Sequence, residues 1–154
     1  MNRRNLKLIT WSDTFACGIK IIDDQHRHLV NLVNDMYRHV TGNFEEEQEY
    51  FNSIIQESEN YIKVHFATEE KIMEAAKYSG YAEHKKAHDE FIVTVEKYIA
   101  NFSSGKRLSL YSFTQSLKDW VLSHIAVMDK QYFSYLSKIA NRNTNAKLGD
   151  TSAA

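Results

Sequence analysis

Two pairs of side chains in this sequence have the residue types and the spacing that metal chemistry requires. His65 precedes Glu69 by four positions, and His84 precedes His88 by four. On an α-helix this spacing places both side chains on one face, one turn apart. Because one helix can offer only one or two ligands in this way, a complete metal site requires several helices that converge.

The periodicity of the apolar residues predicts those helices. Apolar positions recur with alternating steps of three and four along 20–40, 44–76, 81–101 and 109–139, as expected for the seam of a helical bundle. The chain has no proline, the commonest helix breaker. Four amphipathic helices with short connections predict an all-α fold, an up-down-up-down four-helix bundle.

The ends of the chain differ from this pattern. We expect an irregular N-terminal arm over 1–18, the bundle over 19–140, and a disordered tail over 141–154, where the composition becomes polar. Trp11 and Phe15 indicate that the arm packs on the bundle. The single cysteine, Cys17, is expected to behave as a small packed hydrophobe.

Composition narrows the class of protein. The length of 154 residues suits one domain, and a net charge of −1 gives no electrostatic footprint for nucleic acid or an anionic membrane. There is no secretory signal and no apolar run long enough to span a bilayer, so we expect a cytoplasmic protein that contacts neither nucleic acid nor membrane. One cysteine excludes an intramolecular disulfide and a cysteine-rich metal site.

Polar residues occupy seam positions on all four predicted helices, where burial of an unpaired charge is costly. A bound cation resolves that cost for all of them at once. The candidate ligands are His26, His65, Glu69, His84, His88, His124 and Asp129.

The composition of this ligand set indicates two metal ions. Imidazole and carboxylate without thiolate suit iron, manganese or zinc, and the set is too large for one tetrahedral zinc. Two six-coordinate ions have twelve positions. Five imidazoles, two bridging carboxylates and one bridging oxide or hydroxide fill eleven, which leaves one position for a small ligand.

The motifs together also match a known pattern over about residues 11–140. They are Trp11 with Gly18-Ile19, Asp23-Asp24-Gln25-His26, His65-Phe66 with Glu69-Glu70, His84-Lys85-Lys86-Ala87-His88, and His124-Ile125 with Asp129-Lys130. This pattern resembles the hemerythrin family, and within it the single-domain bacterial hemerythrins. Ferritin-like di-iron proteins differ, because they use more carboxylates and a Glu-x-x-His motif.

The resemblance implies a protein that binds O₂ reversibly at a non-haem centre of two Fe ions with an oxo or hydroxo bridge. It implies that His84, His88 and His124 hold one iron, whereas His26 and His65 hold the other, which has the vacancy. Glu69 and Asp129 would bridge the two. In this interpretation the protein is not an enzyme and has no catalytic residues; its partners are O₂ and an unidentified protein.

Three functions remain open at this point. The first is O₂ storage, delivery or sensing. The second is an enzyme on the same site: a di-iron oxidase, a peroxidase or a nitric-oxide-handling protein. The third is a module that signals O₂ to a partner. Five nitrogen donors and few carboxylates favour the first.

The segment between His124 and Asp129 poses a geometric problem. Side chains five residues apart on an ideal helix point about 140° apart, since each residue turns about 100°. Either a π-bulge inserts one extra residue into the turn, which we favour slightly, or Asp129 reaches the metal from the side of a regular helix.

The remaining candidates have weaker grounds. His28 is expected at the surface, and His39 is expected near a helix C-terminus, where a cationic imidazole is favourable. Glu70 is expected either in solvent or beside a ligand. Phe66 and Leu122 flank ligands and would either wall the O₂ pocket, by the resemblance, or serve ordinary core packing.

Overall fold

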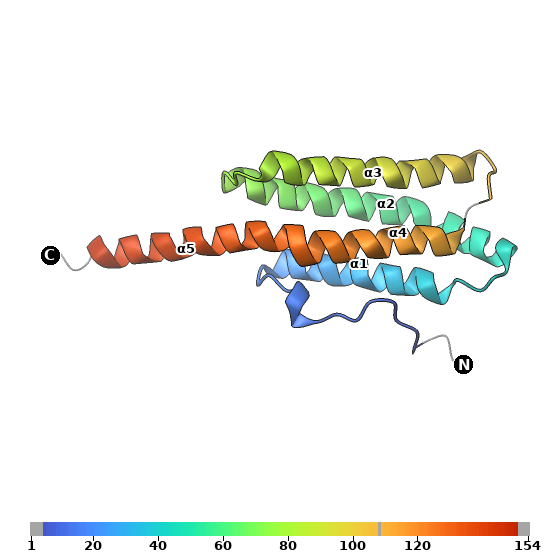
Figure 1. Cartoon of the computed structure of the whole chain (residues 1–154), viewed down its shortest axis with the longest axis horizontal. Helices are drawn as coiled ribbons and strands as arrows, with labels where there is room; N and C mark the ends of the chain where they lie inside the picture. Colours follow the sequence, from blue (N-terminus) through green and yellow to red (C-terminus); the bar gives the residue numbers. More distant parts are fainter. Residues whose placement is uncertain (1–4, 108, 151–154) are drawn as a thin grey trace.

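The computed structural model describes residues 5–107 and 109–150, with side chains described as far as residue 143. Among these residues there are helices and no strands, which confirms the all-α prediction. Figure 1 shows the elements in chain order. They are the 3-10 turn η2 (Asp13–Phe15), α1 (Lys20–Arg38), α2 (Phe44–Ala75), α3 (Tyr81–Ser103), α4 (Leu110–Ser123), the π-helical turn η3 (His124–Asp129) and α5 (Lys130–Asp150).

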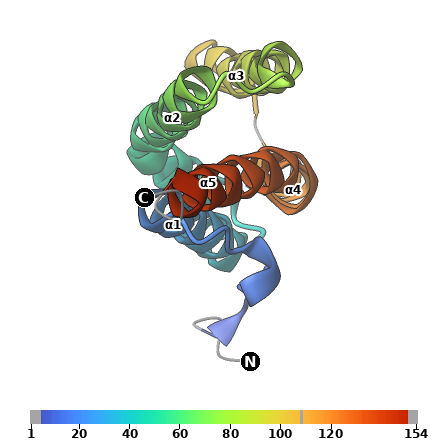
Figure 2. The same cartoon turned by 90° about the vertical axis from the view of Figure 1, so that its left-hand side faces the viewer.

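The helices form the predicted up-down-up-down bundle. α4, η3 and α5 follow one another without interruption, so that they build one long rod, the fourth helix of the bundle (Figure 1). Seen end-on, α2 and α3 lie on one side, and α1 lies with this rod on the other (Figure 2). α1 packs against both α2 and α4, and α2 packs against α3.

The turns that separate the helices have identifiable local causes. Gly42 lies in the connection between α1 and α2. Its φ of +82° is a left-handed conformation that favours glycine. Asn43 then caps α2, because its Oδ1 accepts from the backbone N–H groups of Glu45 and Glu46 at 3.1 and 3.3 Å. Ser109 caps α4 in the same way, through Ser112 N–H at 3.1 Å.

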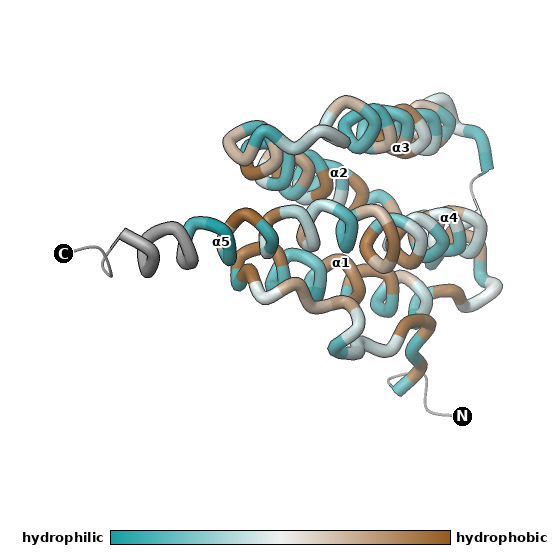
Figure 3. Tube along the Cα trace, turned by 60° about the vertical axis from the view of Figure 1, so that its left-hand side comes forward, coloured by the Kyte–Doolittle hydropathy of each residue, from teal (hydrophilic) through white to brown (hydrophobic). Residues whose placement is uncertain are grey.

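The core consists of two apolar layers with a polar layer between them. Along α1, Ile22 belongs to one apolar cluster and Leu29 to the other, and the buried His26 lies between them. Along α2, Ile62 and Met73 bracket the polar segment in the same manner. Hydrophilic and hydrophobic segments alternate along the coloured parts of the helices, as amphipathic helices require (Figure 3). The fold therefore places polar seam residues at one level of the bundle.

The N-terminal arm packs on the bundle, as predicted. The Asn34 side chain, only 5% exposed, accepts from the N–H groups of Leu8 and Ile9 at 2.7 and 2.9 Å and donates to Ile9 O at 2.8 Å. Trp11 and Phe15 lie 5.5 Å apart and pack against the larger core cluster. The arm is thereby tied to the C-terminal part of α1.

The expectation of a disordered tail over 141–154 is not what the structure shows through Asp150. α5 continues as helix to that residue and projects beyond the other helices (Figure 1). The polar composition lowers the tendency to pack, but Ala, Lys and Leu are good helix formers and no proline stops the helix. Residues 151–154 lie outside the described part of the chain.

Within the described residues, no helix combines the length and the apolar character that crossing a lipid bilayer demands.

Asn34→Ala should release the arm, because it leaves three backbone groups of Leu8 and Ile9 without their partner. We expect the free energy of unfolding in urea to fall by roughly 1–3 kcal/mol. The amide protons of Leu8 and Ile9 should exchange faster. Asn31→Ala, an exposed position on the same helix, is the control and should stay within about 0.5 kcal/mol. Equal stability and equal exchange in both variants would contradict the tether.

Candidate metal centre

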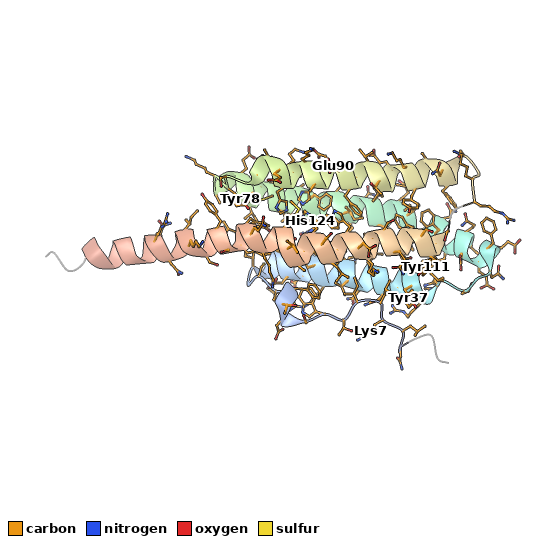
Figure 4. All side chains as sticks on the ribbon, in the orientation of Figure 1. Lys7, Tyr37, Tyr78, Glu90, Tyr111 and His124 are labelled. Atoms are coloured by element: carbon orange, nitrogen blue, oxygen red, sulfur yellow. The ribbon has the colours of Figure 1, made fainter. Side chains whose placement is uncertain are left out.

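The structure brings all seven predicted ligands together at the polar level of the bundle. Each is at most 2% exposed. α1 supplies one of them, α2 two, α3 two, and η3 two. Figure 4 shows His124 inside the bundle, whereas Glu90 of α3 lies on its outer edge. The side chains form two groups that could each hold a metal ion: Glu69, His84, His88 and His124 in the first, and His26, His65, Glu69 and Asp129 in the second.

Glu69 lies between the two groups, with one oxygen facing each. Its Oε1 is 3.3 Å from His26 Nε2 and 3.6 Å from His65 Nε2. Its Oε2 is 3.3 Å from His88 Nε2 and 3.8 Å from His84 Nε2. A carboxylate in this position can bridge two metal ions.

Asp129 has the same divided arrangement. Its Oδ1 lies 3.0 Å from the Nε2 atoms of both His84 and His124, and its Oδ2 lies 3.1 Å from His26 Nε2. The two carboxylates thus each present one oxygen to a group with three histidines and one to a group with two.

A π-helical turn over His124–Asp129 lets both ends of η3 reach the site. The predicted bulge is confirmed, and the alternative of a regular helix is wrong. An α-helix would turn Asp129 about 140° away from His124, whereas the wider turn absorbs one extra residue. The result is the 3.0 Å approach of His124 Nε2 to Asp129 Oδ1.

Three polar side chains contact the candidate ligands from outside the two groups. Gln25 Oε1 lies 2.7 Å from His65 Nδ1, and Glu70 Oε1 lies 3.0 Å from His88 Nδ1. Of the two roles considered for Glu70, the structure therefore supports the one beside a candidate ligand. The buried hydroxyl of Tyr132 donates to Glu69 Oε1 at 3.2 Å.

Sequence reasoning did not single out Gln25 or Tyr132 as functional. Gln25 is next to the candidate ligand His26 in sequence, so its side chain points off the seam, and it contacts His65 and Thr68 of α2. Tyr132 follows Asp129 by three positions and therefore shares its helix face. That spacing was the available signal.

Aromatic rings cover the three-histidine group. Phe66 is stacked on His88 with centroids 3.8 Å apart, and Trp120 is stacked on His124 at 4.3 Å.

The expectation that Leu122 walls the pocket is wrong, because this residue is 37% exposed, whereas the preceding Val121 is fully buried. Adjacent residues on a helix point about 100° apart, so proximity to His124 in sequence did not imply proximity in space.

Burial and the two carboxylates of the cluster shift the pKa values of its histidines in different directions. Burial lowers the pKa of His65 to about 4. Burial acts in the same direction on His26 and His84, but their contacts with Asp129 and Glu69 outweigh it and raise the pKa of each to about 9. Protons on two imidazoles can thus offset the two buried carboxylates, and a divalent cation would take their place.

Unpaired polar atoms at the centre fit a bound metal. Among the described residues, the atoms His26 Nε2, His65 Nε2, His84 Nε2, Glu69 Oε2 and both carboxylate oxygens of Asp129 are buried and make no hydrogen bond of acceptable geometry. Buried groups of this kind are normally satisfied. The nitrogen and oxygen donor set, without sulfur, suits iron, manganese or zinc.

The other two histidines lie away from the cluster, as expected. Both are exposed. His28 packs against Tyr61 with centroids 4.0 Å apart and the ring planes tilted by 31°, and His39 stacks on Tyr50 at 3.7 Å.

Comparison with known proteins agrees with this geometry. The family described as "Hemerythrin HHE cation binding domain" matches residues 17–136. The chain belongs to the hemerythrin family. Hemerythrins are non-haem iron proteins that bind O₂, and the cluster described above is where this hemerythrin can hold a metal.

Individual hemerythrins match most of the chain. The bacteriohemerythrin of Stenotrophomonas maltophilia (strain R551-3) is 33% identical over 127 residues, which are 82% of this chain and 80% of that protein. The hemerythrin of Themiste dyscrita is 29% identical over 84% of this chain and 92% of its own. A crystal structure of wild-type hemerythrin superposes with a TM-score of 0.70 at 28% identity, covering 82% of this chain and 96% of that one.

Cys17 should be a slow nucleophile. Burial, with Asp23 close by, raises the pKa of its thiol to about 12, so little thiolate forms at pH 8. We expect reaction with an aromatic disulfide reagent at pH 8 to be at least about 100-fold slower than that of free cysteine, to accelerate as the pH rises, and to reach the free rate in urea. Rapid reaction of the folded chain would show that Cys17 is not packed as described.

Metal should stabilise the folded chain, because it satisfies donor atoms that are buried without partners. At a free metal concentration of 100 times the dissociation constant, the gain is about 2.7 kcal/mol. The melting temperature, followed by circular dichroism, should therefore drop by roughly 5–10 °C after chelation and recover when divalent metal returns. An identical melting temperature with and without metal would argue against a buried site.

Proposed function

We propose that this protein binds O₂ reversibly at a non-haem centre of two iron ions. The observation that carries the proposal is the divided arrangement of Glu69 and Asp129, each of which presents one oxygen to each histidine group. Two bridging carboxylates require two ions. Membership of a family that binds O₂ at non-haem iron supports the choice of metal and ligand.

The histidines would be shared unequally between the ions. In the proposed assignment, His84, His88 and His124 hold one iron, and His26 and His65 hold the other. With both carboxylates and one bridging oxide or hydroxide, the second iron has one position fewer filled, and O₂ would bind there. Two ferrous ions would supply the two electrons that O₂ takes up when it binds.

The surrounding residues suit binding without turnover. Phe66 is 3% exposed, and its ring, stacked on His88, would keep water from that side of the centre. Burial raises the pKa of Tyr132, so its hydroxyl stays protonated at neutral pH and holds Glu69 by a hydrogen bond. A phenol in this state fixes the carboxylate and does not accept protons from a reacting molecule. Storage, delivery and sensing of O₂ are all compatible with this arrangement.

The test is anaerobic loading with ferrous iron, followed by cycles of O₂ exposure and removal. We expect two iron atoms per chain and charge-transfer absorption that appears with O₂ and disappears when O₂ is removed. One metal per chain, or stoichiometric zinc after expression in iron-rich medium, would contradict the di-iron centre. Rapid irreversible oxidation with turnover of a reductant would instead support the oxidase, peroxidase or nitric-oxide-handling alternative.

Matched variants make this test specific to the proposed ligands. Glu69→Ala or Asp129→Ala removes a bridge and should lower the iron content to one per chain or less. His28→Ala changes an exposed histidine that lies outside both groups and should retain two. Loss of iron in His28→Ala but not in Asp129→Ala would overturn the assignment.

A further inference from the structure

In each of the two histidine groups, one histidine has its outer ring nitrogen, Nδ1, next to a polar side chain, and this side chain differs between the groups. In the group with Asp129, His65 Nδ1 faces the neutral amide of Gln25 at 2.7 Å. In the group with three histidines, His88 Nδ1 faces the carboxylate of Glu70 at 3.0 Å. The outer nitrogens of His26 and His124 have no hydrogen-bond partner among the described residues.

The orientation of the Gln25 amide follows from its second contact. The Thr68 hydroxyl donates to Val64 O at 2.8 Å, so its oxygen is free to accept. Gln25 Nε2 lies 3.3 Å from that oxygen and donates to it. Gln25 Oε1 must then be the atom that accepts from His65 Nδ1–H, which leaves the lone pair of His65 Nε2 directed at the centre.

Glu70 offers His88 an acceptor that carries a negative charge. Its side chain is 20% exposed, and Lys85 Nζ lies 3.8 Å from its other carboxylate oxygen. His88 Nδ1–H is therefore donated to a carboxylate, and its Nε2 also points to the centre, 3.3 Å from Glu69 Oε2.

These two acceptors polarise their imidazoles to different degrees. A carboxylate draws the Nδ1 proton more strongly than an amide does, so the imidazole that it holds is the stronger electron donor to a metal. Stronger donation favours the higher oxidation state of the ion. The amide of Gln25 orients His65 without adding this donation.

We propose that Gln25 and Glu70 are positioning residues that set unequal donor strengths at the two metal sites, stronger on the His88 side and weaker on the His65 side. The inference rests on the proposed di-iron function for its effect on oxygen binding, but the hydrogen bonds themselves do not require iron. On this basis, Gln25 limits the tendency of the O₂-binding iron to remain oxidised when O₂ leaves.

The hydrogen bonds can be measured in the zinc-loaded protein, which is diamagnetic and needs neither iron nor O₂. The Nδ1–H proton of His88 should resonate farther downfield than that of His65. Gln25→Glu should move the His65 proton downfield, and Glu70→Gln should move the His88 proton upfield. If the two protons coincide, or if neither exchange moves its proton, the inference is wrong whatever the function of the protein.

The redox consequence is measured by spectroelectrochemical titration of protein whose iron content has first been determined. Gln25→Glu should shift the equilibrium toward the ferric state by about tenfold, which is about 59 mV lower for a one-electron step. Glu70→Gln should shift it about tenfold in the opposite direction. Shifts of the same sign in both variants, or shifts below twofold, would overturn the proposal.

A control separates the hydrogen bond from the charge alone. Glu74 is exposed and lies one turn beyond Glu70 on α2, so Glu74→Gln removes the same charge. It should change the potential by less than twofold. A shift equal to that of Glu70→Gln would show that charge alone accounts for the effect, and the proposal would fail. Failure of the di-iron function itself would appear differently, as normal zinc spectra in a chain that takes up no iron or shows no reversible oxygenation.

Discussion

The burial of two carboxylates side by side is the constraint on which the rest of this structure depends. Glu69 and Asp129 are fully buried and lie among the same histidines. Moving one such charge out of water costs several kcal/mol even after the protein relaxes, and the repulsion between two adds to it. The surrounding imidazoles, and the cation that they can hold with the carboxylates, make this burial tolerable.

The bundle confines that cost to one level. Apolar layers above and below the cluster supply the hydrophobic stabilisation, and the seven candidate ligands lie where these layers meet. Four helices contribute to the centre, so each backbone segment needs to place only one or two side chains. Gln25 and Glu70 accept hydrogen bonds from His65 and His88, and Tyr132 donates one to Glu69, so that these candidate ligands are held from outside.

Much of this arrangement could be predicted from the sequence, because periodicity reports which residues share a face. The four helices, the seven clustered side chains and the irregular turn after His124 all follow from spacing along single helices. Contacts between helices do not. Gln25 lies off the seam of its own helix, and only the packing of α1 against α2 brings it to His65. Two expectations were wrong for other reasons. Leu122 is near His124 in sequence, but nearness in sequence does not determine where a helical side chain points. The tail has a polar composition, but polar composition does not determine where a helix ends.

The π-turn also limits how this chain can vary. Val127 lies within η3 and is 56% exposed, so its side chain makes little contribution to the core. The number of residues in this turn nevertheless matters. Adding or removing one residue between His124 and Asp129 would rotate everything after it by about 100°. Asp129, Tyr132 and the whole of α5 would then face a different direction. In this segment the number of residues is under stricter constraint than their identity, so substitutions can accumulate at solvent-facing positions where insertions and deletions cannot.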